Sequence, residues 1–235
     1  MGDANSLFSD GDRERIATAV ASAETQTAAE IVCAVASESG RYDRAEGICG
    51  IVTAVFSLAV ANFVLLSDFS GAESTGDGVS HGWSDPVGLG LLGQVMAVCV
   101  GYVLGNLLGS YCHPLRRFFV LQREMDEEVA RSASRVFLSQ RVSATRCAGG
   151  VLVYVSLFER SVVVLADDGV MQHDGQSLVE AARDRAENAL RAGKWVDAFA
   201  DAVGEIAERL RQTLPAAGED VDELQNALRV FHPRP

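Results

Sequence analysis

Residues 150–169 read GVLVYVSLFERSVVVLADDG, which is two apolar runs joined by a short charged link and closed by two aspartates and a glycine. The runs at 151–157 and 162–165 are rich in β-branched and aromatic residues, which favour strands. The link at 158–160 is too short for a parallel crossover, so the strands are predicted to form an antiparallel hairpin. Neither run alternates between apolar and polar residues, and we therefore expect helices on both faces of a sheet that has this hairpin at its centre.

The segments before the hairpin predict further parts of an α/β domain. Ser9 and Asp12 are spaced as a capping pair, which predicts a helix that runs to about residue 27. Residues 30–36 follow as a short, β-branched strand. A stripe of apolar residues then predicts a helix over residues 123–141 that packs on the hairpin.

The last third of the chain is predicted to hold two more helices and a tail. Residues 177–192 form the first helix, which Gly193 ends. Residues 197–214 form the second, with Asp197 as its N-cap. Residues 216–235 combine acidic residues with one short amphipathic turn, and we expect a weakly ordered tail.

Two long stretches without charged residues separate the first strand from the helix at residues 123–141. Residues 48–66 are uncharged, and a helix of this length, at about 1.5 Å per residue, would reach about 28 Å, close to the thickness of the hydrocarbon core of a bilayer. Residues 87–111 are the second such stretch. The sequence thus predicts a two-helix transmembrane hairpin, and a buried helix of a soluble protein is the alternative.

The charges around the two predicted spans indicate their orientation. The intervening loop, residues 67–86, holds four acidic residues and no lysine or arginine. Basic residues flank the outer ends of the pair instead, at Arg41, Arg44, Arg116, Arg117 and Arg123. The positive-inside rule then places both termini of this multi-pass protein in the cytoplasm and the loop outside.

Small residues recur at every fourth position of the second span, at Gly93, Ala97, Gly101, Gly105 and Gly109. Such a stripe lets another helix backbone approach closely, which favours helix association in lipid, where no hydrophobic effect drives it. Thr53, Ser57 and Ala61 give the first span a matching small face. We expect the stripe to offer a face, from Gly93 to Gly109, for a membrane-protein partner or a second copy of the chain, beyond what the hairpin itself needs.

The composition argues against some classes of function. The net charge is −12, so nucleic-acid binding, which requires a basic surface, is not expected. The hydrophobic content of 48% is high for a soluble protein of this size. Five cysteines form neither a CxxC pair nor an even set for disulfides, so reduced thiols that behave as small hydrophobic residues are expected.

The candidate site lies where the second hairpin strand ends, at Asp167 and Asp168. Carboxylates gathered at a strand end are hard oxygen ligands, which suit Ca²⁺ or Mg²⁺. The same Asp-Asp-Gly segment is also typical of a turn, in which an aspartate caps backbone amides and Gly169 takes a positive φ. A turn, a metal site and a catalytic site are therefore the three alternatives here.

The segment GVLVYVSLFERSVVVLADDGV at residues 150–170, preceded by Phe137-Leu138 and Thr145-Arg146, resembles the core signature of the TPM-domain family. The resemblance extends to the AEIV segment at residues 29–32 and to the helical end at residues 210–215. It is greatest for the bacterial branch, whose members carry membrane helices inside the domain. This branch implies a location in the inner membrane of the cell.

The resemblance implies an α/β fold, a three-layer α/β/α sandwich that is split in sequence by the inserted hairpin. Four segments are expected on this basis. Residues 1–47 and 113–215 form the two parts of the TPM-like domain, residues 48–112 form the transmembrane hairpin, and residues 216–235 form the tail.

The resemblance also bears on function and on a third site residue. Glu30 corresponds to the glutamate of the family's AEIV-like segment and would join the two aspartates as a metal ligand; an exposed strand-edge charge or a partner for Arg160 are its alternatives. The expected function is an accessory module that binds a divalent cation or a partner in membrane-protein assembly or quality control. A metal-dependent acid phosphatase, in which Asp167 or Asp168 holds the ion, is the other function that the family implies, so whether the protein is an enzyme stays open.

Overall fold

The computed structural model shows a mixed α/β protein that is mostly helical and has one four-stranded mixed sheet. It divides into two compact units, an α/β unit formed by Met1–Gly40 and Gln122–Pro235, and a helical unit formed by Arg41–Leu121. The structure describes residues 4–69, 91–111, 119–145, 148–172, 175–216 and 224–235.

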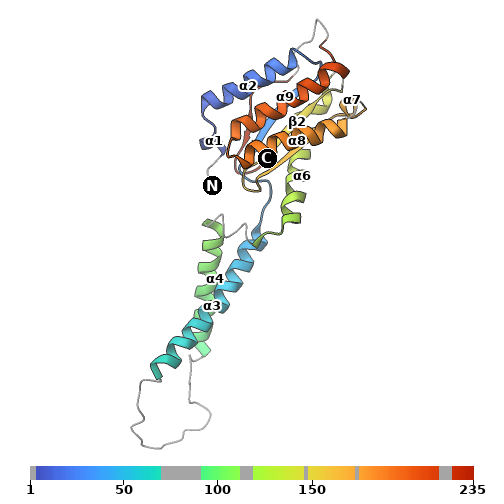
Figure 1. The fold of residues 1–235 in the computed structure, drawn as a ribbon. Helices are drawn as coiled ribbons and strands as arrows, with labels where there is room; N and C mark the ends of the chain where they lie inside the picture. The colour runs from blue at the N-terminus through green and yellow to red at the C-terminus, as the bar shows by residue number, and fades with distance from the viewer. Residues whose placement is uncertain (1–3, 70–90, 112–118, 146–147, 173–174, 217–223) are drawn as a thin grey trace, which may run out of the picture. The chain divides into compact units, whose positions relative to one another are not determined.

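The sheet of the α/β unit has the strand order β3-β2-β1-β4. In Figure 1, α8 and α9 lie in front of this sheet. Strands β2 (Val151–Ser156) and β3 (Ser161–Ala166) pair antiparallel, which confirms the predicted hairpin. Strand β1 (Ile31–Ala36) pairs in parallel with β2 over its whole length. The prediction that the hairpin forms the centre of the sheet is wrong for β3, which is an edge strand, because β1 takes the other side of β2 and leaves β3 with one neighbour.

The expectation of a weakly ordered tail is wrong for the last residues of the chain. Arg229–Phe231 form β4, which pairs in parallel with β1 at the edge of the sheet. The pairing continues beyond the strands, because the Ser37 N–H donates to the Phe231 carbonyl at 3.1 Å and the Glu38 N–H donates to the Pro233 carbonyl at 3.0 Å. The tail therefore supplies acceptors for outward-facing N–H groups of β1 and of the residues that follow it, which a local reading of the sequence does not reveal.

Helices cover both faces of β1 and β2, and all residues of these two strands are buried. On one face the core includes residues of α2 (Asp10–Glu24), α8 (Gly175–Arg191) and α9 (Trp195–Thr213). On the other face Val129, Ala133 and Val136 of α6 (Gln122–Ser139) pack on the even-numbered residues of β1 and β2. Three short helices complete the unit, α1 (Ala4–Leu7), η1 (Val142–Ala144) and α7 (Asp168–Met171).

The ends of two helices test the capping predictions. Ser9 caps α2 through the predicted capping box, since its Oγ accepts from the Asp12 N–H at 3.2 Å and its own N–H donates to the Asp12 carboxylate at 3.1 Å. The N-cap of α9 is Lys194, so the prediction of Asp197 is wrong. Trp195 packs against the core, which explains why the helix begins before Asp197.

The helical unit contains α3 (Asp43–Phe69) and α4 (Leu91–Tyr111). Both are long and apolar enough to cross a membrane, with mean hydropathies of 2.1 and 1.8 over the candidate spans. Only 17% and 11% of these spans are buried, which disfavours the alternative of buried core helices and indicates association with a membrane. Most of the predicted outer loop, residues 67–86, lies outside the described residues.

The glycine stripe of α4 packs on α3. Gly101, Gly105 and Gly109 are buried, and a Cβ added to Gly105 would lie 2.6 Å from the Thr53 Oγ1 and 2.7 Å from the Cys49 carbonyl. Three of the five stripe residues are thus used inside the hairpin, and a further face for a partner along Gly93 to Gly109 stays a prediction. The outward surface carries large apolar side chains instead, among them Phe56, Val60, Phe63, Val95, Val103, Leu104 and Leu107.

We predict that Gly105→Ala lowers the melting temperature of the helical unit in detergent, whereas Gly47→Ala does not. The added methyl group at residue 105 would overlap the α3 backbone, and overpacking of this kind costs about 1–3 kcal/mol. Gly47 is a matched control, because a Cβ there meets nothing within 4 Å and the change to alanine favours the helix. Equal melting temperatures for the two variants would contradict the close packing of α3 and α4.

Candidate functional site

Asp167 is the single residue between the end of β3 and the first residue of α7. Its N–H donates to the Gly150 carbonyl at 2.9 Å, which continues the β2–β3 ladder, and its Oδ1 accepts from the Asp168 N–H at 2.8 Å as the N-cap of α7. Its other oxygen, Oδ2, is buried and has no hydrogen-bond partner in the described part of the chain. Asp168 is exposed in the first turn. The capping aspartate matches the turn alternative, although Gly169 lies within α7 instead of taking a positive φ.

Glu30 is 7% exposed, so the alternative of an exposed charge at the strand edge is wrong. Its Oε2 accepts from the Leu224 N–H at 3.3 Å and so binds the segment that leads into β4. Arg160, the other proposed partner, lies in the β2–β3 turn at the opposite end of the sheet. Tertiary structure therefore gives this carboxylate a backbone donor from the far end of the chain.

The sheet topology brings Glu30 and Asp167 to the same end of the strands, with Gly150 between them. The Val151 N–H donates to the Glu30 carbonyl at 2.8 Å, so two strand spacings, about 10 Å, separate the two backbones. A Cβ on Gly150 would lie 1.8 Å from the Val142 carbonyl oxygen, which shows that the backbone of η1 fills the space above this glycine. Only glycine fits at position 150 for this reason.

The described residues contain no group of three or more histidine, cysteine, aspartate or glutamate side chains placed to hold a metal ion. Asp167 and Asp168 are consecutive, and Glu30 is engaged by Leu224 two strands away. His173 and Asp174, which follow the aspartates in sequence, lie outside the described residues. The metal site at Asp167, Asp168 and Glu30 thus stays a prediction.

Sequence reasoning missed a buried polar cluster at the opposite end of the sheet. The cluster consists of Ser39, Ser132, Tyr154, Ser156 and Glu159, each 3% exposed or less. The Ser39 Oγ donates to the Ser156 Oγ at 2.8 Å and lies 2.9 Å from the Tyr154 hydroxyl. The Ser156 Oγ donates in turn to the Glu159 Oε2. The only local signals were a serine that ends an apolar run and a glutamate in the hairpin link.

The hydrogen bonds of this cluster have defined directions. Burial raises the pKa of the Tyr154 phenol, which the nearby Glu159 carboxylate also raises although the hydrogen bond with Ser39 lowers it, so Tyr154 is neutral and can donate. Because the Ser39 hydroxyl gives its proton to Ser156, it accepts from Tyr154. The chain runs from Tyr154 through Ser39 and Ser156 to Glu159. Its burial keeps substrates away, and the arrangement suits a structural role.

Cys33 behaves as the composition led us to expect. It is a free thiol in the core between the sheet and its helices, and burial raises its pKa. Cys49 is also free and buried, whereas Cys99 is free and exposed on α4. A buried thiol with a raised pKa is a poor nucleophile, so Cys33 is a packing residue and not a catalytic one.

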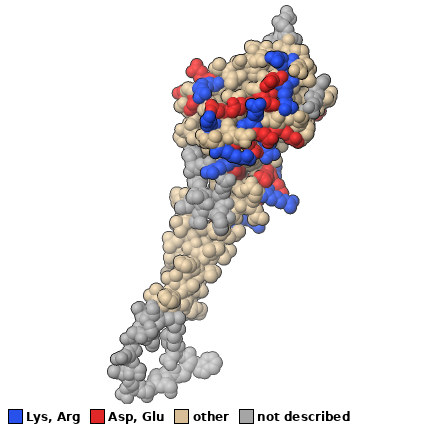
Figure 2. All heavy atoms as spheres, in the orientation of Figure 1, with Lys and Arg blue, Asp and Glu red and all other residues tan. Residues whose placement is uncertain are grey.

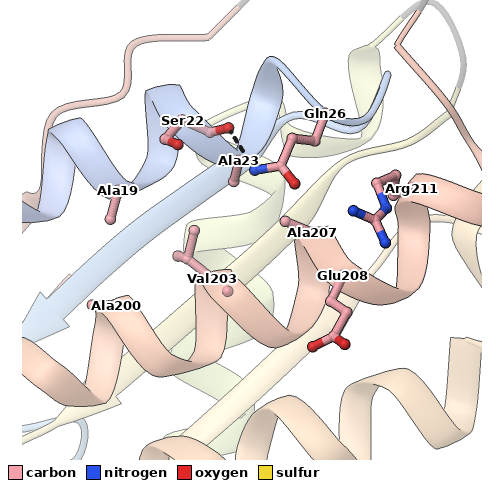
Figure 3. A pocket seen from close by; sticks show the side chains of 10 residues that line it. Ala19, Ser22, Ala23, Gln26, Ala200, Val203, Ala207, Glu208 and Arg211 are labelled. Carbon is pink, nitrogen blue, oxygen red and sulfur yellow. Dashed lines mark hydrogen bonds between the residues drawn. The ribbon is translucent and has the colours of Figure 1, made fainter.

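Two open grooves run beside α9. The first, about 430 Å³, lies between α2 and α9 and is lined by small residues such as Ala19, Ala23 and Ala207, together with Gln26 and Arg211 (Figure 3). The second, about 460 Å³, lies along α8 and α9. Its two arginines share one ion-pair partner, since Arg185 and Arg209 lie 3.2 Å and 2.6 Å from the Glu205 carboxylate. Acidic and basic side chains alternate in the same way over the face of the α/β unit in Figure 2.

We predict that Asp167→Ala lowers the free energy of unfolding of the α/β unit by about 1 kcal/mol, because the variant loses the N-cap of α7. Asp168→Ala, an exposed neighbour with the same change in chemistry, is expected to stay within about 0.5 kcal/mol of the wild type. Urea unfolding of the detergent-solubilised chain, followed by tryptophan fluorescence, measures both. Similar losses in the two variants would contradict the capping role of Asp167.

No family model matches the chain, and no curated protein matches it. Among solved structures, the fold is similar to the NMR structure of the BA42 protein from the psychrophilic bacterium Bizionia argentinensis, with a TM-score of 0.53 and 13% sequence identity. The match covers 95% of this chain and 94% of that one. At this identity the likeness concerns the fold alone, and it supports the mixed α/β architecture described above.

Proposed function

We propose that this protein is a multi-pass protein of the inner, cytoplasmic membrane, in which α3 and α4 cross the bilayer and both termini lie in the cytoplasm. The α/β unit then acts as an accessory module that binds a divalent cation or a membrane-protein partner during membrane-protein assembly or quality control. We also propose that this unit is a three-layer α/β/α sandwich of the TPM type, which the sequence resemblance and the helices on both sheet faces support.

The apolar outward surface of α3 and α4 carries this proposal. Phe63 is 72% exposed and Phe56 is 67% exposed, and many aliphatic side chains on both helices are also exposed. Leaving one such side chain in water costs about 1.5–3 kcal/mol relative to burying it, so this surface requires a cover. The glycines already bind α4 to α3, and a bilayer is the cover that suits the length and hydropathy of both helices.

A binding role suits the α/β unit better than catalysis. Among the carboxylates discussed above, Glu30 binds a backbone N–H, Asp167 caps α7 and Glu159 is sealed inside the unit. The Cys33 thiol is buried as well. Asp167 and the exposed Asp168 are the groups through which a cation could bind, as Ca²⁺ or Mg²⁺, with water completing its ligands.

The buried Oδ2 of Asp167 favours a second candidate function, a metal-dependent phosphatase. A carboxylate oxygen without a hydrogen-bond donor is costly to bury, and a cation would compensate it. A metal held there would polarise a phosphoryl oxygen and activate water. The protein would then be an enzyme of the kind that the family resemblance implies.

We predict that the wild-type chain stays in membranes after an alkaline carbonate wash and that Val103→Arg reduces the recovered amount. Val103 is an exposed residue near the middle of α4, where arginine costs about 2.5–3.5 kcal/mol on insertion scales. Leu138→Arg is the matched control, since Leu138 is also exposed but belongs to α6 of the α/β unit. Removal of the wild-type chain by carbonate would contradict the transmembrane hairpin.

Protease treatment of vesicles tests the orientation. If the α/β unit is cytoplasmic, trypsin degrades it in inside-out vesicles and leaves it intact in right-side-out ones. The reverse result would contradict the proposed topology while leaving the two membrane spans in place.

We predict that Ca²⁺ or Mg²⁺ binds the detergent-solubilised chain and that the double variant Asp167→Asn, Asp168→Asn loses this binding, because both carboxylate charges are gone. Calorimetric titration provides the measurement. Glu30→Gln is the control that separates Glu30 from the two aspartates: retained binding would mean that Glu30 is not a ligand of the cation. A wild-type chain that binds neither ion would leave partner binding as the remaining function.

Hydrolysis of a generic phosphate ester separates the two candidate functions. A phosphatase turns the ester over with metal and stops with chelator or in the Asp167→Asn, Asp168→Asn variant. A binding module shows cation binding without turnover. Turnover that both substitutions leave unchanged would remove the two aspartates from any catalytic mechanism.

A further inference from the structure

Ser39 uses all of its polar groups in hydrogen bonds to three other elements of the α/β unit. Its N–H donates to the Glu159 Oε1 at 2.9 Å, and its carbonyl accepts from the Ser132 Oγ of α6 at 3.0 Å. Its hydroxyl bonds Tyr154 and Ser156 of β2. Ser39 is therefore held at once by α6, by β2 and by the turn that follows β2.

Ser39 lies next to the point at which the chain leaves the α/β unit. Gly40 is the last residue of the α/β unit before the chain enters the helical unit, and the Gly40 N–H donates to the same Glu159 oxygen at 3.3 Å. The chain returns to the α/β unit at Gln122, the first residue of α6, which carries Ser132. The hydrogen bond from Ser132 to Ser39 thus joins the segment that leaves the unit to the helix that re-enters it.

We propose that Ser39, Ser132, Tyr154, Ser156 and Glu159 form an exit clamp, a device that couples the outgoing segment, the returning helix α6 and the β2–β3 turn so that they loosen together. Movement of the outgoing segment would then reach α6 through Ser132 and the turn through Glu159.

Burial is the physical reason for the coupling. Loss of the Glu159 carboxylate leaves the N–H groups of Ser39 and Gly40 and the Ser156 hydroxyl without their acceptor, in a place that water does not reach. Unsatisfied buried donors cost about 1–3 kcal/mol each, so the outgoing segment opens to water to satisfy them. Such opening moves the Ser39 carbonyl away from Ser132 and transmits the loss to α6.

Amide hydrogen exchange of the full-length chain in detergent tests the clamp through a residue that does not bond the amides observed. Ser132→Ala is expected to raise the exchange rates of the Ser39 and Gly40 amides by about fivefold or more, since one lost hydrogen bond is worth about 1 kcal/mol. Ser134→Ala is the matched control on the same helix, because Ser134 is exposed and bonds only the Ala130 carbonyl of its own helix. It is expected to leave these rates unchanged.

Glu159→Gln provides the reciprocal measurement: it keeps one oxygen that can accept from the Ser39 and Gly40 N–H groups but puts an NH2 donor in place of the oxygen that accepts from Ser156. It is expected to raise exchange in α6 around Ser132, to which none of these hydrogen bonds runs. In the Ser132→Ala, Glu159→Gln double variant, the increase at Ser39 and Gly40 should equal that of the stronger single variant. A product of the two single increases would mean that the contacts act independently and would overturn the proposal. Faster exchange only at the amides that bond the substituted residue would overturn the proposal as well. If Glu159→Gln fails to fold, Ser132→Ala decides the question alone.

Discussion

Parallel pairing of β1 with β2 is the constraint on which the rest of the structure depends. These strands come from segments on either side of the inserted helices, and their register aligns Ile31 with Val151 and Ala36 with Ser156. Parallel strands require a long crossover, and here the inserted helices and α6 lie within it. The pairing also makes β1 and β2 the two inner strands, so that both must be apolar on each face and covered by helices.

The two units differ in how they arrange their apolar side chains. In the α/β unit, alternate residues of β1 and β2 face α6 on one side and the group formed by α2, α8 and α9 on the other, and the exposed helix faces carry ion pairs. In the helical unit, glycines allow close contact between α3 and α4, while large side chains project outward. This contrast is the physical basis of the proposal that α3 and α4 lie in lipid.

The carboxylates at the two ends of the sheet show how tertiary context changes the meaning of a residue. Asp167 and Glu30 lie at one end of the sheet, with β2 between them, and accept hydrogen bonds from backbone N–H groups of α7 and of the carboxyl-terminal segment, respectively. Glu159, which appears as a charge in a hairpin link, is buried at the other edge and holds Ser39 and Gly40. Acidic residues at strand ends are thus structural acceptors of backbone N–H groups here.

The sequence by itself determined the local elements: the β2–β3 hairpin, the capping box of α2, the amphipathic helices and the two long apolar helices all follow from periodicity, turn length and short-range hydrogen bonding. It left a turn, a metal site and a catalytic site as alternatives for Asp167 and Asp168, and the structure shows Asp167 as the N-cap of α7. Only the tertiary structure decided that β3 is an edge strand, that the tail supplies β4, that the glycine stripe is covered by α3 and that Ser39, Ser132 and Glu159 meet. These contacts join residues far apart in the chain, so no local pattern encodes them. A buried donor requires an acceptor, but the sequence near the donor does not say which distant residue supplies it.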